Sequence, residues 1–174
     1  MRDVLDWLEA LGVRWYITGS EAGACCGVLR QTFDTDIVLD RTPGQFATIA
    51  RAFEHDHAVA DEIIFGDFSM ASVINRSTTE KADLILRRPS AWTDSTMNRR
   101  QWTSHPAFGW VWVSSLEDLW LAKLVWSEGT SELQLRDCGI LLRVNRDQMD
   151  HTYLDRWALA LGVQRLLEEV RGAT

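Results

Sequence analysis

The stretch that decides the fold is residues 16–40, which read YITGSEAGACCGVLRQTFDTDIVLD. It starts in a short apolar strand, turns at Gly19-Ser20 into small apolar residues that predict a helix, and ends in a second apolar strand. That second strand carries Asp34 and Asp36. Side chains at positions i and i+2 of a strand point to one face, so the two carboxylates should project together. Two neighbouring carboxylates on so apolar a strand need a positive partner, which predicts a site for a divalent cation.

The Gly19-Ser20 turn predicts a phosphate-binding segment. Glycine lets the backbone approach a ligand closely, and the N–H groups that open the following helix favour an anion. Ser20 adds a hydroxyl group. Mg²⁺ prefers a few carboxylates together with substrate phosphates. A phosphate site beside a two-carboxylate metal site is the arrangement that phosphoryl and nucleotidyl transfer require.

The order and spacing of these residues resemble a known superfamily. Gly19-Ser20, followed after residues 21–33 by Asp34-Thr35-Asp36-Ile37, is similar to the signature of nucleotidyltransferases with the DNA polymerase β-like fold. The small bacterial members resemble the chain most, namely the minimal nucleotidyltransferases and the AbiEii-type toxins of toxin–antitoxin pairs. Those proteins tend to carry an Arg-X-Thr before the aspartates, here Arg30-Gln31-Thr32. The resemblance implies a nucleotide-binding set that includes Gly19, Ser20, Arg30 and Thr32.

A third carboxylate matches the superfamily on a later strand. Asp83 lies in the apolar segment 81–86, which reads KADLIL. The resemblance implies that Asp34, Asp36 and Asp83 are the catalytic residues and hold magnesium, with two ions expected. The alternative for Asp83 is an aspartate at a strand edge that pairs with an arginine.

The end of the chain extends the resemblance. Residues 115–119 followed by Lys123, and then Arg136-Asp137, are similar to the later motifs of the small bacterial nucleotidyltransferases. The resemblance implies that Lys123 and Asp137 belong to the nucleotide-binding site. The second aspartate of the late motif is missing, since residues 138–141 read CGIL. The alternative for Lys123 is a buried structural ion pair with Asp137 or Glu117, because a buried lysine needs a partner.

The patterns and the resemblance together predict an α+β chain. Its expected form is the nucleotidyltransferase fold, a mixed β-sheet flanked by helices and followed by a C-terminal helical segment. Residues 1–113 are expected to form the nucleotidyltransferase α/β core, and residues 114–174 a helical segment packed on it. Residues 87–106 are polar and contain two prolines, so we expect a loop with a short helix there.

The composition is that of an acidic globular chain. With 174 residues it is long enough for one ordinary domain. No run approaches the ~20 apolar residues of a membrane span. The first residues, MRDVLDWLEALGV, carry acids and lack a signal-peptide pattern, so a cytoplasmic protein without a membrane partner is expected. The net charge of −7 argues against a surface that coats nucleic acid but allows a local basic groove.

Residues 87–106 contain the candidate contacts to an acceptor substrate. The pairs Arg87-Arg88 and Arg99-Arg100 either steer a phosphate-rich acceptor such as RNA or belong to a solvated loop. Among the nine tryptophans, Trp92 and Trp102 are the candidates for stacking on a base. Trp126 lies in an apolar segment and is expected in the core.

The predicted function is Mg²⁺-dependent transfer of a nucleoside monophosphate from a nucleoside triphosphate (NTP) to an acceptor hydroxyl. The resemblance implies an RNA 3′ end or a protein as acceptor, and a place in a toxin–antitoxin system with a cognate antitoxin or toxin as partner. A small molecule such as an antibiotic is the alternative acceptor. Two other hypotheses remain: an antitoxin-like or catalytically weak binding partner, and a structural module whose carboxylates are held by salt bridges.

Overall fold

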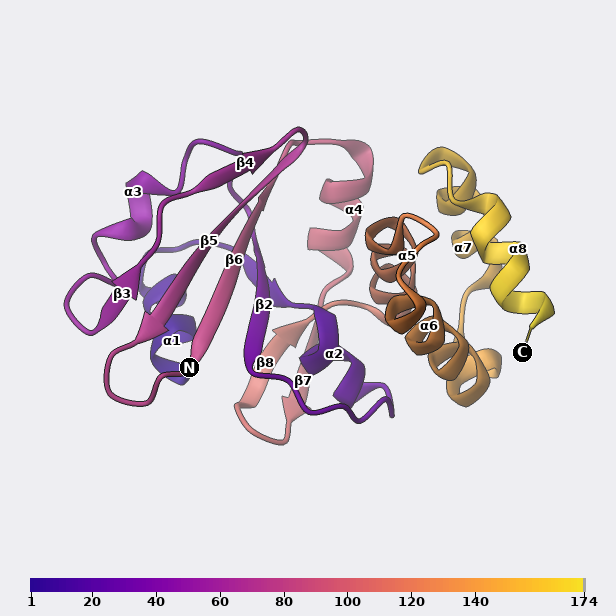
Figure 1. Ribbon diagram of the computed structural model, residues 1–174, viewed down its shortest axis with the longest axis horizontal. Helices are drawn as coiled ribbons and strands as arrows, with labels where there is room; N and C mark the ends of the chain where they lie inside the picture. Colours follow the sequence, from indigo (N-terminus) through magenta and orange to yellow (C-terminus); the bar gives the residue numbers. More distant parts are fainter. Residues whose placement is uncertain (174) are drawn as a thin grey trace.

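The chain folds into a mixed eight-stranded β-sheet with helices on both faces (Figure 1), as a computed structural model of residues 1–173 describes it. The strands are β1 Trp15–Ile17, β2 Asp34–Leu39, β3 His57–Val59, β4 Ile63–Phe65, β5 Phe68–Asn75, β6 Lys81–Arg87, β7 Gln101–His105 and β8 Gly109–Val113. Their order is β3-β5-β6-β2-β1-β8-β7, with β4 paired to β5. The predicted α+β class is confirmed.

The helices divide into a group around the sheet and a group at one end of the molecule (Figure 1). Around the sheet lie α1 Arg2–Ala10, α2 Gly19–Cys25, α3 Ala47–Ala50 and α4 Ala91–Arg99. At the end lie α5 Leu116–Ser127, α6 Glu132–Asn145, the 3₁₀ turn η1 Arg146–Gln148, α7 His151–Ala160 and α8 Gln164–Gly172. No helix within residues 1–173 is both long and apolar enough to cross a membrane.

Alternation along β2 and β6 gives the sheet two unlike faces. The main core contains one set of alternate positions together with side chains of α1 and α3, and this set is Ile37, Leu39, Leu84 and Leu86. The positions between them face the other way, with Asp36 followed by Val38 on β2 and Asp83 followed by Ile85 on β6. Met97 of α4 packs against Val38 and Ile85 and covers one end of this second face. The carboxylates therefore lie at its other end.

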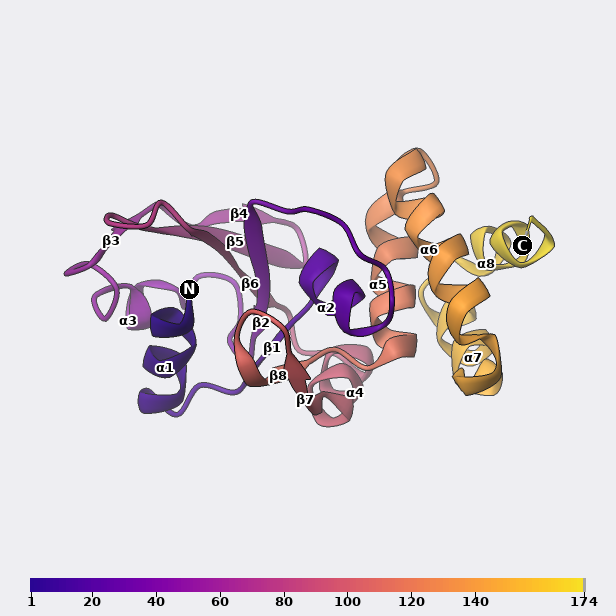
Figure 2. The same cartoon turned by 90° about the horizontal axis from the view of Figure 1, so that it is seen from below.

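The four late helices share a second core that reaches into the first part of the chain. Trp120 of α5 and Leu141 of α6 are fully buried in it, together with Ala22 of α2 and Trp92 of α4. Both views place α5 beside α2 and α4, and Figure 2 shows α6 on the far side of α5. The late helices thus pack on the sheet layer through α2 and α4, while a domain boundary at residue 113 stays a prediction.

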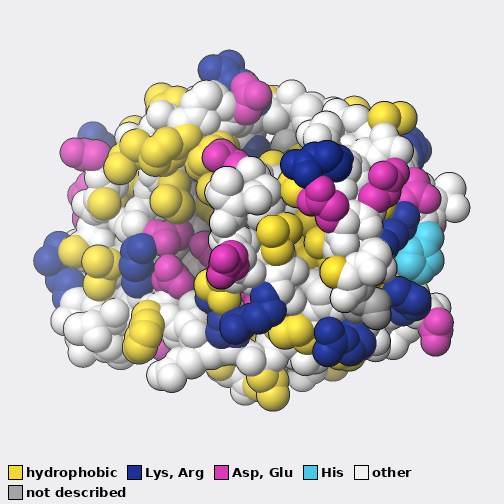
Figure 3. Space-filling model, turned by 45° about the vertical axis from the view of Figure 1, so that its right-hand side comes forward, with side chains coloured by type: hydrophobic (Ala, Val, Ile, Leu, Met, Phe, Trp, Pro, Cys, Tyr) yellow, Lys and Arg dark blue, Asp and Glu magenta, His cyan; other side chains and the backbone are white. Residues whose placement is uncertain are grey.

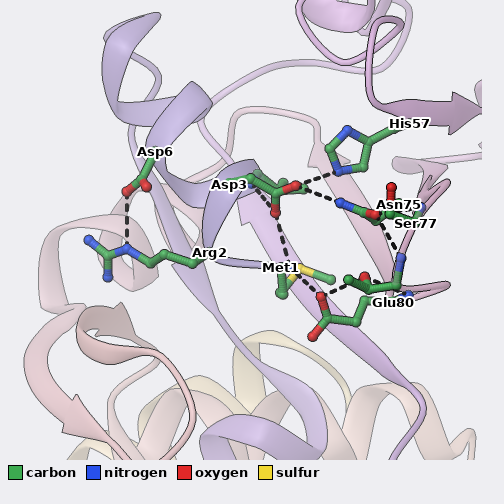
Figure 4. Close-up of polar contacts among 10 residues, drawn as sticks. Met1, Arg2, Asp3, Asp6, His57, Asn75, Ser77 and Glu80 are labelled. Carbon is green, nitrogen blue, oxygen red and sulfur yellow. Dashed lines mark hydrogen bonds and ion pairs between the residues drawn. The ribbon is translucent and has the colours of Figure 1, made fainter.

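A polar network ties α1 to the strands that lead into β6 (Figure 4). The amino group of Met1 lies 2.7 Å from a carboxylate oxygen of Glu80 and 3.0 Å from one of Asp3. The other oxygen of Asp3 lies 3.1 Å from Nε2 of His57 and accepts a 2.9 Å hydrogen bond from the Asn75 amide. Because Glu80 directly precedes β6, this network anchors the start of the strand that carries Asp83.

The prediction of a loop with a short helix over residues 87–106 was wrong in part. Ser90 and Thr93 form a capping box, which starts a nine-residue helix, α4. Residues 101–105 form β7, which pairs with β8 and places Trp102 opposite Trp112. The polar alternation of this segment is typical of an edge strand with one solvated face.

Candidate active site

Three aspartates and one lysine occupy neighbouring positions on one face of the β2–β6 pair. The two strands are parallel, and the register places Asp36 opposite Asp83 and Asp34 opposite Lys81. Because alternate residues share a face, all four side chains project from the same side of the sheet. The structure therefore brings together the three carboxylates that the sequence selected, and it adds Lys81, which sequence reasoning missed.

Asp36 has a strongly raised pKa. Burial, reinforced by the charges of Asp34 and then Asp83, raises the pKa of Asp36 to about 6. The positive charges of Lys123 and Lys81 act in the opposite direction. The site thus concentrates negative charge that a cation would stabilise.

Asp34 and Asp83 are both held by hydrogen bonds. The Thr32 hydroxyl donates to Oδ1 of Asp34 over 2.7 Å. Ser72 Oγ donates to Oδ1 of Asp83 over 2.5 Å, and Lys81 Nζ donates to Oδ2 over 2.8 Å. The bond to Asp83 is also the main reason why the pKa of Lys81 is raised. Thr32 therefore orients a carboxylate, and Asp83 pairs with a lysine rather than with an arginine.

Gly19 lies directly against the carboxylate of Asp36. A Cβ atom at position 19 would come within 2.0 Å of Asp36 Oδ2, and the backbone of Gly19 has a φ of +64°. Both facts require glycine, since an L side chain would clash and would strain the left-handed conformation. The first turn of α2 is therefore in contact with the carboxylate set, as the Gly-Ser motif predicts.

Ser20 and Arg30 contact each other beside this turn. Ser20 is buried in α2, and its hydroxyl accepts a hydrogen bond from the guanidinium group of Arg30. The segment between α2 and β2 thus folds back so that Arg30 reaches Ser20 while Thr32 reaches Asp34. The residues of the Arg-X-Thr motif support the Gly-Ser turn and the first aspartate respectively.

Lys123 faces the carboxylates across a cavity of about 240 Å³. The cavity lies between the sheet and α5 and is lined by Gly19, Asp36, Asp83 and Lys123 among others. Lys123 is almost fully buried, and its Nζ lies 2.9 Å from Asp137 and 3.2 Å from the Gln134 side chain. Lys123 therefore forms the structural ion pair with Asp137 and also lines the cavity. Asp137 holds the Lys123 ammonium at the cavity wall.

A second cavity of about 500 Å³ continues from the first toward α4. The two cavities share Thr18, Ile85, Ala122 and Trp126 in their walls. The larger one adds aromatic side chains and two arginines, namely Tyr16, Phe68, Trp92, Arg87 and Arg88. A volume of this size, mostly apolar with a few polar groups, is typical of a small-molecule site.

Trp126 lies at the rim of these cavities, so its assignment to the core was wrong. Its side chain is 46% exposed, and its ring makes an edge contact with Phe68 at 4.6 Å between centroids. Trp92 is buried but lines the larger cavity. Trp102 lies on β7 against Trp112 and lines neither cavity.

A space-filling view shows acidic side chains within a hollow that hydrophobic side chains border (Figure 3).

The four arginines of residues 87–100 are engaged within the chain. Arg87 stacks over the ring of Trp92 at 4.0 Å, and Arg99 forms a 2.7 Å ion pair with Glu117. Arg100 lies over the ring of Trp112, and Arg88 donates to a backbone carbonyl. Arg88 lies in an exposed loop, as one of the two readings expects, whereas Arg99 is paired with an acid and Arg87 and Arg100 stack on tryptophan rings.

The residues fit a divalent cation only after a rearrangement. In residues 1–173, no group of three or more His, Cys, Asp or Glu side chains is gathered closely enough to hold a metal ion. The donor set is nonetheless suitable, because carboxylate oxygens are the preferred ligands of Mg²⁺. The Lys81 ammonium already places a positive charge beside Asp83, where a cation would otherwise lie. Asp34, Asp36 and Asp83 would hold the cation, which would neutralise charge on phosphate and hydroxyl oxygens.

The ionisation of Asp36 predicts an unusual dependence of stability on pH. Its pKa is about 6 in the folded chain against 3.8 for an ordinary aspartate, so the folded state binds the proton more tightly. Folding stability should therefore fall as pH rises from 4 to 7, by up to about 3 kcal/mol from this residue. We expect the thermal midpoint of Asp36→Asn, relative to the parent, to increase over that pH range in a chelator-containing buffer. An Asp61→Asn variant at an exposed position is the control, and a pH-independent difference for Asp36→Asn would contradict the prediction.

Comparisons with known proteins agree with this geometry. No family model matches the chain, and no curated protein matches it. TM1012 of Thermotoga maritima, assigned provisionally to the nucleotidyltransferases, is similar with a TM-score of 0.56 and 19% identity over 78% of this chain and 87% of that one. The antibiotic-resistance factor ANT(2'')-Ia gives 0.55 and 16%, over 98% and 90%. The lincosamide antibiotic adenylyltransferase LnuA, solved with lincomycin, gives 0.54 and 13%, over 81% and 93%.

These likenesses show that the chain has the nucleotidyltransferase fold. The expected fold is therefore confirmed. At such low identity the likeness does not extend to activity, and the narrower resemblance to AbiEii-type toxins stays a prediction.

Proposed function

We propose that this chain is a Mg²⁺-dependent nucleotidyltransferase that transfers a nucleoside monophosphate from an NTP to an acceptor hydroxyl. The observation that carries the proposal is the register of β2 and β6, which sets Asp36 opposite Asp83 at the point where Gly19 touches Asp36. Three carboxylates on one face of the sheet, beside a glycine turn, are the oxygen donors that such a transfer would use once their side chains close on a cation.

Several residues in and beside the smaller cavity have roles in this proposal. The backbone of the Gly19-Ser20 turn binds the triphosphate, with Arg30 holding the Ser20 hydroxyl in place. Lys123, oriented by Asp137, supplies positive charge to the same phosphates from across the cavity. Asp83 would lie next to the acceptor hydroxyl and take its proton, while the acceptor oxygen bonds to the α-phosphorus and pyrophosphate leaves.

The second cavity favours a small-molecule acceptor over an RNA 3′ end. It is large enough for a drug-sized ring system, its walls contain aromatic side chains, and it adjoins the smaller cavity that Asp83 lines. Of the arginines that would steer RNA, Arg99 is paired with Glu117, and Arg87 lies over the ring of Trp92 in the cavity wall. An RNA or protein acceptor, a toxin–antitoxin role, and an antitoxin-like binding role remain predictions that no structural observation here favours.

The test is nucleotide incorporation with defined acceptors. The purified chain is incubated with each α-labelled NTP and Mg²⁺, in the presence of total RNA, of cell protein, or of hydroxylated ring compounds such as lincosamides and aminoglycosides. Label on a small molecule supports the proposal as stated, whereas label on RNA or protein retains the transferase but replaces the acceptor. If no acceptor is labelled and calorimetry detects no heat on adding Mg²⁺ and NTP, the chain is a structural module.

The rim residue Trp126 should matter for this reaction. Trp126→Ala removes an aromatic wall shared by both cavities and its contact with Phe68. We expect kcat/KM to fall about tenfold, because one aromatic contact is worth about 1 kcal/mol or more. Trp110→Ala, at an exposed position outside both cavities, is the control. Equal kinetics of the two variants would exclude both cavities as the substrate site.

A further inference from the structure

Lys81 is the only positively charged residue among the four that face one another on this side of the β2–β6 pair. The register of β2 and β6 places four side chains on one face, with Asp34 opposite Lys81 and Asp36 opposite Asp83. Opposite charges at such facing positions attract, whereas facing carboxylates repel. The lysine is therefore set by the strand geometry itself, next to all three acids.

The contacts show that Lys81 forms its ion pair with Asp83. Its Nζ lies 2.8 Å from Oδ2 of Asp83, and Oδ1 of Asp83 accepts from Ser72, so both carboxylate oxygens are engaged. The Lys81 side chain is 37% exposed and that of Asp83 only 6%. The partner with access to solvent is thus the lysine, whose long side chain can turn outward without moving the strand.

The other lysine cannot replace it. Lys123 is buried and held by Asp137 and Gln134 on the far wall of the cavity. The charge of Asp83 is therefore balanced directly by Lys81, while Lys123 remains bound to its own partner.

We propose that Lys81 is a built-in counter-ion that occupies the cation position at Asp83 until a divalent cation displaces it. The inference rests on the proposed function, because it takes the carboxylates as metal ligands. Lys81 lets the sheet fold with three acids together, and it weakens the binding of free metal. The cation is then bound mainly together with an NTP, whose phosphates add ligands and charge.

The chain offers a direct readout because Lys81 and Lys123 are its only lysines. The full-length protein is treated with an amine-acylating reagent, and each lysine peptide is quantified by mass spectrometry with and without Mn²⁺. NaCl at equal ionic strength controls for screening. We expect labelling of Lys81 to rise at least about twofold with the metal, and labelling of Lys123 to stay constant, since Lys81 has access to solvent whereas Lys123 and its partner Asp137 are both buried. Unchanged labelling of Lys81 at saturating metal would overturn the proposal.

A variant tests the competition independently. Lys81→Met should bind Mn²⁺ about fivefold more tightly than the parent by calorimetry without nucleotide, and it should melt at a lower temperature in chelator. Arg165→Met removes a charge from an exposed pair on α8 and is the matched control for net charge. Equal or weaker Mn²⁺ binding by Lys81→Met overturns the role of Lys81 and leaves the proposed function intact. A parent that binds no divalent cation even with NTP overturns both.

Discussion

Replacing Asp36 with asparagine is expected to reduce nucleotidyl transfer at least about a thousandfold without lowering the thermal midpoint at pH 8. The amide keeps the shape of the side chain but loses the charge that would hold the cation, and loss of a metal ligand removes most of the stabilisation of the transferred phosphate. Stability should be equal or higher, because the carboxylate is buried beside Asp34 and Asp83 and its pKa is raised. The measurements are label incorporation and a thermal melt on the same preparation.

The combination of the two readouts makes this result specific. A residue needed only for folding would lower the thermal midpoint together with activity, and Asp61→Asn should change neither. Transfer at the parental rate in Asp36→Asn would remove the proposed mechanism, whatever its stability.

Substituting alanine for Gly19 is expected to abolish transfer and to destabilise the fold. The new Cβ would lie 2.0 Å from Asp36 Oδ2, so either the turn or the carboxylate must move. The left-handed backbone adds roughly 1–2 kcal/mol for any L residue. We expect a total loss of about 3 kcal/mol in the free energy of unfolding, measured by denaturant titration.

Gly12 provides a matched control for this substitution. It has the same φ of +64°, but a Cβ there would meet no atom within 4 Å. Gly12→Ala therefore measures the backbone strain alone, and the difference of about 2 kcal/mol between the two variants measures the contact with Asp36. Equal destabilisation, with transfer retained in Gly19→Ala, would show that the Gly-Ser turn is not part of the site.

Much of this site was predictable because its residues are marked by local patterns. The i, i+2 spacing of Asp34 and Asp36 determines their common face, and a Gly-Ser turn before a helix is readable from a single segment. Asp83 was selected as an isolated acid in an apolar strand, although only the resemblance connected it with the other two. The register that sets it opposite Asp36 depends on the strands between them, so no local pattern contains it.

The features that were missed depend on contacts between distant segments. Lys81 carried no signal of its own, since a lysine at the start of a strand is common. Its importance follows from its place opposite Asp34. The edge strand β7 was read as loop because its sequence is polar, and pairing with β8 overrides that local preference. Trp126 was placed in the core because α5 is apolar on all sides, whereas the cavities leave its ring half exposed.

The parallel pairing of β2 with β6 affects the order in which parts of the chain fold. Parallel neighbours cannot be joined by a tight turn, and here β3, β4 and β5 lie between them in the chain. Such long-range pairing closes late in folding, after the local hairpins. The juxtaposition of Asp36 and Asp83 should therefore be among the last features that a refolding or newly synthesised chain acquires.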